Sequence, residues 1–512
     1  MTSTLVKRVL ELAETQPEKT ALAFRKEAVS YASFAEQIRK AAALIRSLNV
    51  ERGARVLYTA VSKPSTFVLY LAIQYAGAVA VPTDKVGTAE HELSLYEDAG
   101  ASLLITALKK PPVTDGRKVV TQKEFFARLD DAASNVFPYE LPDGEELAEI
   151  LFTSGTTGKP KGVMLSYRAV WNILNNTRKG VGITEDDIVL MPLPLHHSLA
   201  LRCSRATLCA GGTLVLQNGF IFASETEKNQ KDFRCTGFVA VPVSMELLRG
   251  QMQDRFYEIM SAFRFIEIGA GALSVEQRKR LSKNLPGTQI TNTWGSSETG
   301  GVIFTYVHDV AEQESRVSTL GVAIEGAELM FIDPGEEYAA GHGAPGQSAE
   351  YPGRLAIRGG MVMSGYWDRP DLTEDALRDG WLVTNDLTWR DEDGYVFMLG
   401  RSDDIINIGG EKLSPLEVEN AASEYEEAGE YACIGVPDPD GILGQVPVLF
   451  AGKCTPAFSE TELRKFLAAR MERLKLPAKI FAVEALPRNR MEKLDRKAIA
   501  ALYKTLGGSK DA

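Results

Sequence analysis

Apolar residues along the chain recur with two different spacings. Over residues 32–48 they return at every third or fourth position, which predicts an amphipathic helix, and the apolar run at 55–58 predicts a strand. The same alternation of helix and strand recurs through residues 150–300, and it favours a layered α/β structure with parallel sheets. The longest apolar run, at 67–81, contains interruptions and is too short to cross a bilayer. We therefore expect it to form a buried helix and a buried strand.

The pattern changes after residue 316. Short stretches bounded by glycine predict strands, and they lie at residues 328–332, 353–357 and 394–398. Residues 333–352 are rich in Gly, Pro and Glu, which predicts a surface loop. We therefore expect a small β-rich subdomain over about 316–400. After residue 403 a compact α+β pattern runs to a polar tail at 507–512.

Composition narrows the class of protein. At 512 residues the chain is long enough for at least two domains, and its apolar share of 45% is that of an ordinary globular protein. Its net charge of −11 makes nucleic acid and an anionic membrane surface unsuitable partners, so any anionic ligand must be held by local basic clusters.

The cysteines and the first residues of the chain indicate the cellular compartment. The five cysteines are odd in number and include no Cys-x-x-Cys pair, so we interpret them as reduced thiols rather than a zinc site or a disulfide framework. Acidic residues follow soon after Lys7 and Arg8, and we expect no secretory signal. These observations predict a cytoplasmic protein without stable membrane insertion.

Residues 153–162, which read TSGTTGKPKG, follow an apolar strand pattern at 150–152. Glycines and small hydroxyl residues let a backbone wrap closely around phosphate oxygens, and lysines add positive charge. A Walker nucleotide loop requires Ser or Thr directly after Gly-Lys, but here Lys159 is followed by Pro160, which has neither an N–H group nor a hydroxyl. The segment therefore predicts a triphosphate-binding loop of another kind, with a flexible turn as the alternative.

Four further segments follow this loop in order: 292–298 (NTWGSSE), 381–386 (WLVTND), 400–419 (beginning GRSDDII and ending EVE) and 486–493 (LPRNRMEK). Together the five segments resemble the signature motifs of the adenylate-forming superfamily, which contains acyl- and aryl-CoA ligases, luciferases and stand-alone adenylation domains. The chain departs from the family pattern at two positions. Ser297 replaces a threonine but keeps the hydroxyl, and Asn385 replaces a glycine.

The resemblance implies an α/β fold. The large N-terminal AMP-binding domain, residues 1–402, is expected to consist of layered α/β subdomains plus a small β-barrel-like subdomain. A small, mobile α+β domain, residues 403–512, follows it. In the family this domain presents different faces to one pocket in two half-reactions, and Asp403 matches the hinge position.

The resemblance also implies how ATP is bound. The loop residues that match the family's β- and γ-phosphate site are Thr153, Ser154, Gly155, Thr156, Thr157, Gly158 and Lys161. Glu298 would bind Mg²⁺ bridging the phosphates, because a carboxylate is a hard oxygen ligand, and Trp294 would stack on adenine. The same pocket is expected to include Gly271, Ala272, Asn292, Thr293, Gly295 and Ser297. Taken alone, Glu298 is also compatible with a carboxylate at the start of a helix.

Three residues later in the chain are implied to complete the nucleotide site. Asp386 would accept the ribose hydroxyls, since a carboxylate accepts from two donors, and Arg401 would reach the ribose or a phosphate. Lys493 would be the catalytic cation that bridges the substrate carboxylate and the α-phosphate, and its ammonium is charged without special tuning. The alternatives are a turn residue for Asp386 and a surface ion pair with Asp403 or Asp404 for Arg401.

The segment 193–201 resembles the part of the family that closes the acyl pocket. His197 takes the position of the family's histidine near the substrate carboxylate, and His196 replaces the usual aromatic neighbour. A buried histidine bonded to backbone is the alternative for His197. The small residues Gly269, Ala270 and Gly271 are expected to leave room for a medium or bulky acyl or aryl group, although such a run by itself indicates only tight packing.

Two arginines, Arg202 and Arg205, follow on a predicted helix. They either recognise a second acidic group of the substrate or lie on the helix surface, and we expect the surface role.

The stretch 408–412 resembles the lining of the pantetheine tunnel in CoA ligases. Gly409 and Gly410 would let a thin cofactor arm pass, and Lys412 would assist with a phosphate. A plain β-turn is the alternative for the glycines.

These features predict an ATP-dependent carboxylic acid–CoA ligase, in fatty acid or aromatic acid metabolism, that forms an acyl-adenylate with release of pyrophosphate and then an acyl-CoA thioester. Its small-molecule partners would be a carboxylic acid, ATP and CoA, with Mg²⁺. The nearest alternative is a stand-alone adenylating enzyme that loads the acyl group onto the phosphopantetheine of an acyl carrier protein; the run at 406–410 favours free CoA. The presence of Glu298, Asp386 and Lys493 together argues against a catalytically silent nucleotide-binding protein, and no feature indicates luciferase chemistry.

Overall fold

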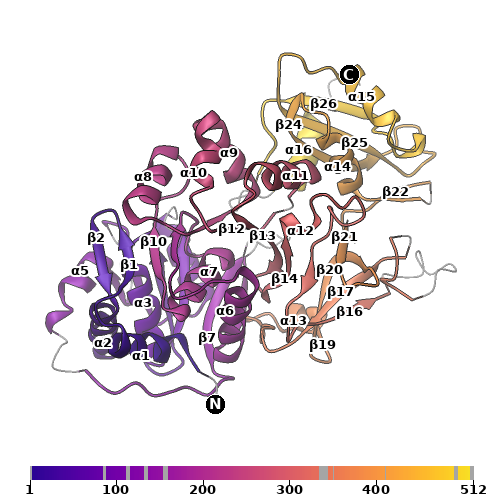
Figure 1. Cartoon of the computed structure of the whole chain (residues 1–512). Helices are drawn as coiled ribbons and strands as arrows, with labels where there is room; N and C mark the ends of the chain where they lie inside the picture. The colour runs from indigo at the N-terminus through magenta and orange to yellow at the C-terminus, as the bar shows by residue number, and fades with distance from the viewer. Residues whose placement is uncertain are drawn as a thin grey trace.

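The structure of the chain is a computed structural model. It describes residues 3–84, 88–110, 116–131, 136–153, 160–271, 273–333, 344–349, 351–409, 411–488 and 494–507. In Figure 1 a large α/β part runs from indigo to magenta, an orange β-rich part follows it, and a smaller yellow part contains the end of the chain.

One large sheet has nine strands among the described residues, in the order β15-β14-β13-β12-β11-β9-β10-β1-β2. Its central strands run parallel, as the alternating pattern predicts. The strands are β1 (Thr20–Phe24), β2 (Glu27–Ser30), β9 (Ile188–Met191), β10 (Thr213–Leu216), β11 (Gly237–Ala240), β12 (Phe265–Gly269), β13 (Gln289–Ser296), β14 (Gly300–Tyr306) and β15 (Val322–Ala323). Because parallel strands end at the same edge, the carboxyl ends of β9 to β13 bring the segments after them together.

A second sheet has seven strands in the part of the chain that is described, in the order β18-β8-β7-β4-β3-β5-β6. They are β3 (Arg55–Ala60), β4 (Val79–Asp84), β5 (Leu103–Thr106), β6 (Val119–Thr121), β7 (Leu147–Thr153), β8 (Lys161–Ser166) and β18 (Gly365–Tyr366). β7 and β8 are antiparallel, which differs from the parallel arrangement expected for this region. The connection between them is only seven residues long, and a parallel crossover takes about a dozen or more, so the chain must turn back on itself.

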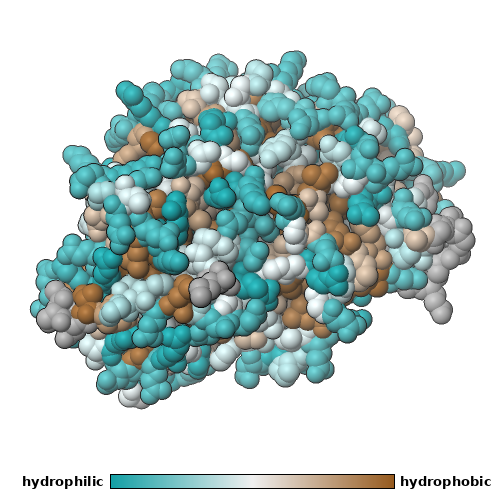
Figure 2. All heavy atoms as spheres, turned by 60° about the horizontal axis from the view of Figure 1, so that its bottom comes forward, coloured by the Kyte–Doolittle hydropathy of each residue, from teal (hydrophilic) through white to brown (hydrophobic). Residues whose placement is uncertain are grey.

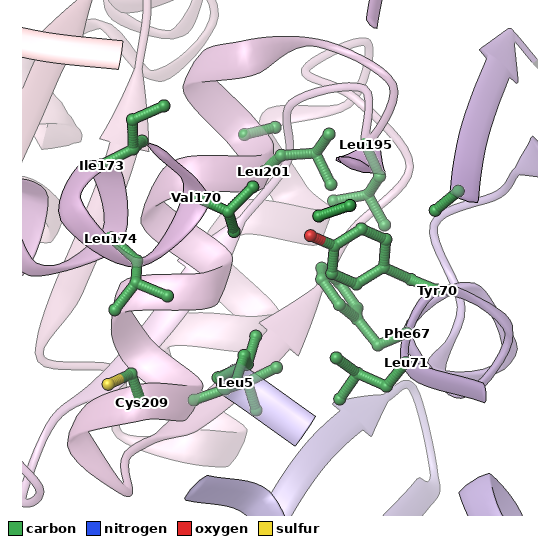
Figure 3. Close-up of a cluster of buried hydrophobic side chains, with 14 of the residues drawn as sticks. Leu5, Phe67, Tyr70, Leu71, Val170, Ile173, Leu174, Leu195, Leu201 and Cys209 are labelled. Atoms are coloured by element: carbon green, nitrogen blue, oxygen red, sulfur yellow. The ribbon is translucent and has the colours of Figure 1, made fainter. Parts of the chain in front are cut away.

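Helices fill the space between the two sheets. The largest core cluster takes side chains from α1 (Leu5–Thr15), α2 (Tyr31–Ser47), α3 (Pro64–Tyr75), α6 (Tyr167–Val181) and α7 (Ser198–Ala210), and from strands of both sheets. Figure 3 shows part of this cluster, with Leu5, Tyr70, Val170 and Leu201 contributed by four different helices. The predicted helix at 32–48, the strand at 55–58 and the buried helix and strand within 67–81 are confirmed as α2, β3, α3 and β4.

The outer faces of both sheets are covered as well. α4 (Ala89–Asp98) packs on the seven-stranded sheet. Helices α8 (Ala223–Phe233), α9 (Pro242–Met252), α10 (Phe256–Met260) and α11 (Val275–Asn284) pack on the nine-stranded sheet. Two short helices, α5 (Gln122–Ala127) and α12 (Val307–Val310), follow β6 and β14. The layered α/β arrangement expected for the N-terminal part is therefore confirmed.

A sheet of short strands follows, as the pattern after residue 316 predicts. It contains β16 (Glu328–Ile332), β17 (Gly353–Arg358), β19 (Leu377–Arg378), β20 (Trp381–Arg390) and β21 (Val396–Arg401), and α13 (Pro370–Ala376) precedes β19. The three strands predicted at 328–332, 353–357 and 394–398 correspond to β16, β17 and β21. Most of the predicted loop 333–352 lies outside the described residues.

The last part of the chain is α+β. A hairpin, β22 (Ile406–Ile408) and β23 (Glu411–Leu413), precedes a sheet of β24 (Ala428–Pro437), β25 (Gln445–Cys454) and β26 (Lys479–Val483). Helices α14 (Pro415–Ser423), α15 (Glu460–Ala468) and α16 (Arg496–Gly507) accompany this sheet, and it has core clusters of its own. Residues 402–405 connect β21 to β22.

The surface mixes polar and apolar residues. Hydrophilic side chains cover most of the face shown in Figure 2, with smaller hydrophobic areas between them. Within the described ranges, no helix has the length and apolar character needed to cross a membrane. All five cysteines are free thiols.

Candidate active site

Glu298 lies in the turn between β13 and β14, so the alternative of a helix start is wrong. The hydroxyl of Tyr366 donates a hydrogen bond to Glu298 Oε1 at 2.9 Å, and the amide of Met363 donates to the Glu298 carbonyl at 2.8 Å. The Nζ atom of Lys161 lies 5.4 Å from the centre of the Tyr366 ring. Burial and the Glu298 carboxylate raise the pKa of Tyr366 well above its ordinary value, so the phenol stays a donor. Tyr366 thus brings together segments near residues 161 and 298.

The predicted phosphate loop joins two paired strand ends. Thr153, the last residue of β7, is the register partner of Lys161, the first of β8. At the next residue a Cβ atom on Gly162 would lie 2.9 Å from Ile150 and 3.0 Å from Trp367, which leaves no room for a side chain. Residues 154–159 lie outside the described residues, and so do Ala272, Gly410 and Lys493. Their predicted roles stay predictions.

β13 carries the residues predicted to surround adenine. The side chain of Asn292 accepts from Arg278 Nη2 and donates to the Ile268 carbonyl, both at 2.8 Å, and Thr293 Oγ1 donates to Glu267 Oε1 at 2.9 Å. These side chains therefore make contacts within the protein. Trp294 next to them is half-buried.

Only glycine fits at position 295. A Cβ atom there would lie 1.9 Å from the carbonyl oxygen of Gly300, so the backbone of β13 and β14 touches at the start of the turn that carries Glu298. Ser297, in the same turn, is half-buried.

The predicted acyl pocket adjoins this turn. Ser198 Oγ, at the start of α7, donates to the Ser296 carbonyl at 3.5 Å, which places His197 close to the end of β13. The rings of His196 and His197 have centroids 3.8 Å apart. Burial lowers the pKa of His196 from its ordinary value, which favours the neutral imidazole.

The small residues after β12 lie against α7 and α9. A Cβ atom on Gly269 would lie 3.2 Å from Leu199, and one on Gly271 would lie 3.2 Å from Pro242. Ala270, between them, has a φ of +61°, a left-handed conformation that costs an L-residue about 1 kcal/mol or more. Such strain is often found at functional sites, and the predicted place of Ala270 in the acyl pocket stays a prediction.

Asp386 and Arg401 form a second group, on the sheet of short strands. They are register partners on β20 and β21, with Arg401 Nη1 3.9 Å from Asp386 Oδ1. Asp386 lies within a strand, so the turn alternative is wrong. Arg401 Nε also donates to Asp403 Oδ1 at 3.0 Å, which is the ion pair considered as the alternative for Arg401. Its predicted contact with ATP stays a prediction.

Gly409 directly follows β22 and has a φ of +62°, and Ile408 pairs with Glu411 across the hairpin. Gly409 therefore lies in a tight turn, and the predicted role of this segment in binding CoA stays a prediction. The Gly409 amide donates to the Leu443 carbonyl at 2.7 Å. Leu443 in turn lines a cavity of about 400 Å³ together with Val446, Pro447, Arg473, Leu474, Leu476 and Ala478.

The surface position expected for Arg202 and Arg205 is wrong. Both side chains are buried, and each forms an ion pair with a buried glutamate of a neighbouring strand. Helical spacing gave no sign of this, because both faces of α7 are covered by other elements.

Comparison with known proteins agrees with this geometry. The model of one family, described as AMP-binding enzyme, matches residues 10–367, and that of the AMP-binding enzyme C-terminal domain matches residues 417–493. The chain belongs to the AMP-binding enzyme family. The predicted superfamily and the predicted fold class are confirmed.

Relatives of this AMP-binding enzyme match over nearly its whole length. It is 29% identical to 2-succinylbenzoate–CoA ligase of Geobacillus kaustophilus over 95% of both chains, and 29% identical to feruloyl-CoA synthase of an Amycolatopsis species over 93% of this chain and 94% of the relative. Among solved structures, ATP-bound MatB from Rhodopseudomonas palustris superposes with a TM-score of 0.85 at 25% identity, covering 99% of this chain and all of the other.

The AMP-binding enzyme offers one predicted metal ligand, Glu298. Among the described residues there is no group of three or more His, Cys, Asp or Glu side chains suited to a metal. Mg²⁺ commonly takes one or two protein carboxylates and completes its shell with substrate phosphates and water. Tyr366 bonds one oxygen of Glu298, and no other bond from the described residues holds the second, so the site fits such an ion.

Sequence reasoning missed Tyr366. A tyrosine after Gly365, followed by Trp367, resembles an ordinary core aromatic. Only its contact with Glu298, 68 residues away, distinguishes it.

Proposed function

We propose that the protein is an ATP-dependent carboxylic acid–CoA ligase that works through an acyl-adenylate. The observation that carries this proposal is the meeting of Glu298, Tyr366 and Lys161 beside the paired ends of β7 and β8. The prediction of an AMP-forming acid–CoA ligase is confirmed at this level by the curated relatives, which are acid–CoA ligases that match over almost the full chain.

In the first half-reaction a carboxylate oxygen of the acid attacks the α-phosphorus of ATP, and the bond to the pyrophosphate oxygen breaks. The residues between Thr153 and Lys161 would hold the β- and γ-phosphates. Trp294 would cover adenine, and Asp386 would accept the ribose hydroxyls. Mg²⁺, held by Glu298, would neutralise charge on the phosphates. Lys493 would stabilise the charge that develops at the α-phosphate.

In the second half-reaction the CoA thiol attacks the acyl carbon, AMP leaves with the bonding electron pair, and the thiol proton passes to solvent or a base. We assign the passage of the pantetheine arm to the hairpin at Gly409 and to Lys412. The cavity lined by Leu443 is adjacent to this hairpin. A carrier-protein phosphopantetheine is the alternative acceptor.

Two domains belong to the proposal. We place the boundary between residues 1–402 and 403–512, with Asp403 as the hinge, and assign the subdomain 316–400 to the N-terminal side. Residues 402–405 connect two strands of different sheets, which is a suitable place for a change of backbone torsion. A cytoplasmic location is part of the same proposal, since all five cysteines are free thiols.

For the acid, we propose an aryl or aryl-bearing carboxylic acid, because the relatives' names include 2-succinylbenzoate and feruloyl. A Cβ atom at position 269 or 271 would meet Leu199 or Pro242, so these glycines are closely packed and the choice of acid does not rest on them.

The test is a screen of acids by pyrophosphate release, with and without CoA, that starts with 2-succinylbenzoate, ferulate, malonate and a medium-chain fatty acid. Pyrophosphate release that needs an acid, and thioester formed only with CoA, supports the proposal. Thioester formed on a phosphopantetheinylated carrier protein but not on CoA selects the alternative acceptor. The Lys493→Ala variant is the negative control, because we expect it to form no adenylate. If no acid stimulates pyrophosphate release by the folded protein, the proposal is wrong.

A further inference from the structure

Helix α7 carries two buried arginines one turn apart, and each is paired with a glutamate of a different sheet. Arg205 pairs with Glu149 of β7 in the seven-stranded sheet, and Arg202 pairs with Glu267 of β12 in the nine-stranded sheet. The exposed fraction of these four side chains does not exceed 5%. One helix therefore joins the two halves of the N-terminal core through charged contacts.

Arg205 holds the strand that leads into the phosphate loop. Its Nη1 atom donates to Glu149 Oε1 at 2.5 Å and to the Tyr70 hydroxyl at 3.1 Å, and that hydroxyl donates to Glu149 Oε2 at 2.9 Å. Side chains alternate along a strand, so Glu149 and Thr153, four residues on, face the same side of the sheet. This is the side of the helical layer shown in Figure 3, where Tyr70 projects from α3.

Arg202 holds the strands that lead to the acyl and adenine residues. Its Nη2 atom donates to Glu267 Oε1, and Glu267 also accepts from Thr293 Oγ1 and from the Cys203 thiol, both at 2.9 Å. Glu267 lies two residues before Gly269, and Thr293 directly precedes Trp294. A Cβ atom on Gly269 would lie 3.4 Å from Arg202 Nη2, so the arginine is in direct contact with this segment.

Stability alone does not account for these pairs. A buried ion pair is often no better than apolar residues of the same volume, because both charges lose their hydration. Arg205 has the further cost that its Nε and Nη2 groups are buried without a hydrogen-bond partner among the described residues. What the pairs do supply is direction, since a planar guanidinium fixes both its distance and its angle to a carboxylate.

We propose that Arg202 and Arg205 are positioning residues that set the phosphate-binding end of β7 relative to the adenine- and acyl-binding ends of β12 and β13. The proposal rests on the function proposed above. Loss of Arg205 displaces the end of β7 and weakens contacts to the β- and γ-phosphates. Loss of Arg202 displaces the segments at Gly269 and Trp294 and weakens contacts to the adenosine part.

The roles of the two arginines can be distinguished by measuring the binding of two nucleotides. Binding of Mg²⁺·α,β-methylene-ATP and of AMP is measured by isothermal titration calorimetry, because AMP lacks the phosphates that the loop would hold. A misplacement of about 1 Å in an active site can cost about 100-fold in rate. We therefore expect Arg205→Met to weaken the binding of α,β-methylene-ATP by about tenfold or more. The affinity of this variant for AMP should stay within about threefold of the parental value, which is the size of an ordinary surface effect. Arg202→Met should weaken both nucleotides by similar factors.

Arg264 provides a matched control. It directly precedes the same strand, β12, and pairs at 2.6 Å with Asp187, which is buried. This pair lies at the opposite edge of the sheet from Gly269. Arg264→Met should lower the melting temperature and leave both affinities unchanged. If all three methionine variants lose stability but keep parental affinities, the pairs are structural only and the proposal is wrong.

The single variants leave a buried glutamate without its arginine, which could prevent folding. A second set of variants tests the proposal in that case. Arg205→Met combined with Glu149→Gln, and Arg202→Met combined with Glu267→Gln, leave no unpaired charge and should recover much of the thermal stability. The losses of affinity should persist: the Arg205 double variant should bind α,β-methylene-ATP more weakly, and the Arg202 double variant should bind both nucleotides more weakly. Recovery of affinity together with stability overturns the proposal. A parental protein that binds neither nucleotide refutes the proposed function instead.

Discussion

Replacing Tyr366 with phenylalanine removes one oxygen atom and, with it, the 2.9 Å hydrogen bond to Glu298. The ring and its contact with Lys161 remain. Tyr366 is only 9% exposed, and its raised pKa keeps the hydroxyl protonated over any ordinary assay range. The variant therefore tests a single donor and not a titrating group.

The size of the effect follows from the charge of the acceptor. A hydrogen bond to a charged group contributes about 1.5–3 kcal/mol. Glu298 is half-buried, so water can replace part of the lost contact, and we take the lower end. Since about 1.4 kcal/mol corresponds to a factor of ten, the Mg²⁺ concentration for half-maximal activity should rise about tenfold. Partners that orient a metal ligand typically alter metal affinity by about 10–100-fold, which agrees with this value.

The assay is acid-dependent exchange of pyrophosphate into ATP, measured across a Mg²⁺ titration. Tyr351→Phe is the matched control, because Tyr351 is also buried and its hydroxyl donates to a carboxylate, that of Asp333, at 3.3 Å. The control should keep the parental Mg²⁺ dependence. The reasoning is refuted if Tyr366→Phe folds normally and its Mg²⁺ dependence and maximal rate equal those of the parent.

Three further predictions concern the proposed catalytic lysine, the proposed hinge and His196. Lys493→Ala should abolish adenylate formation while thioester formation from supplied acyl-adenylate stays largely intact; equal loss of both half-reactions, measured separately, contradicts the alternation of domains. Asp403→Pro fixes φ near −65° and removes a backbone donor, so it should trap one domain orientation. If the adenylating form is trapped, pyrophosphate exchange should survive and acyl-CoA production should be lost. Acyl-CoA produced at the parental rate would show that Asp403 is not the pivot. Burial, aided by His91 and opposed by Asp84, lowers the pKa of His196 below its ordinary value of 6.5. The unfolded chain therefore binds the proton more strongly than the folded chain. As a result, the stability of the fold decreases as the pH drops through 6.5 towards the folded pKa. Between pH 7.5 and 5.5 the melting temperature of His196→Gln should therefore fall less than that of the parent, and identical pH profiles would exclude this role for His196.

Several features of the protein are determined by sequence alone, because they depend on neighbours in the chain. Hydrophobic spacing is sufficient for α2, β3 and the three strands of the β-rich part, since each depends on which face of one element is apolar. The residues of the proposed nucleotide site are also close in sequence, because Trp294, Gly295 and Glu298 belong to one strand and one turn. Gly295 is required there by a backbone contact only five residues away.

Other features are decided only by the tertiary structure, because they depend on partners far along the chain. The burial of Arg202 and Arg205 depends on glutamates 65 and 56 residues away, and periodicity reports the direction of a side chain but not what covers it. Tyr366 meets Glu298, the predicted metal ligand, across 68 residues of the sequence. Likewise, the antiparallel pairing of β7 and β8 results from the short connection between them, which overrides the parallel order of the surrounding strands. In each case the decisive contact forms only when the two sheets and the helices between them have packed together.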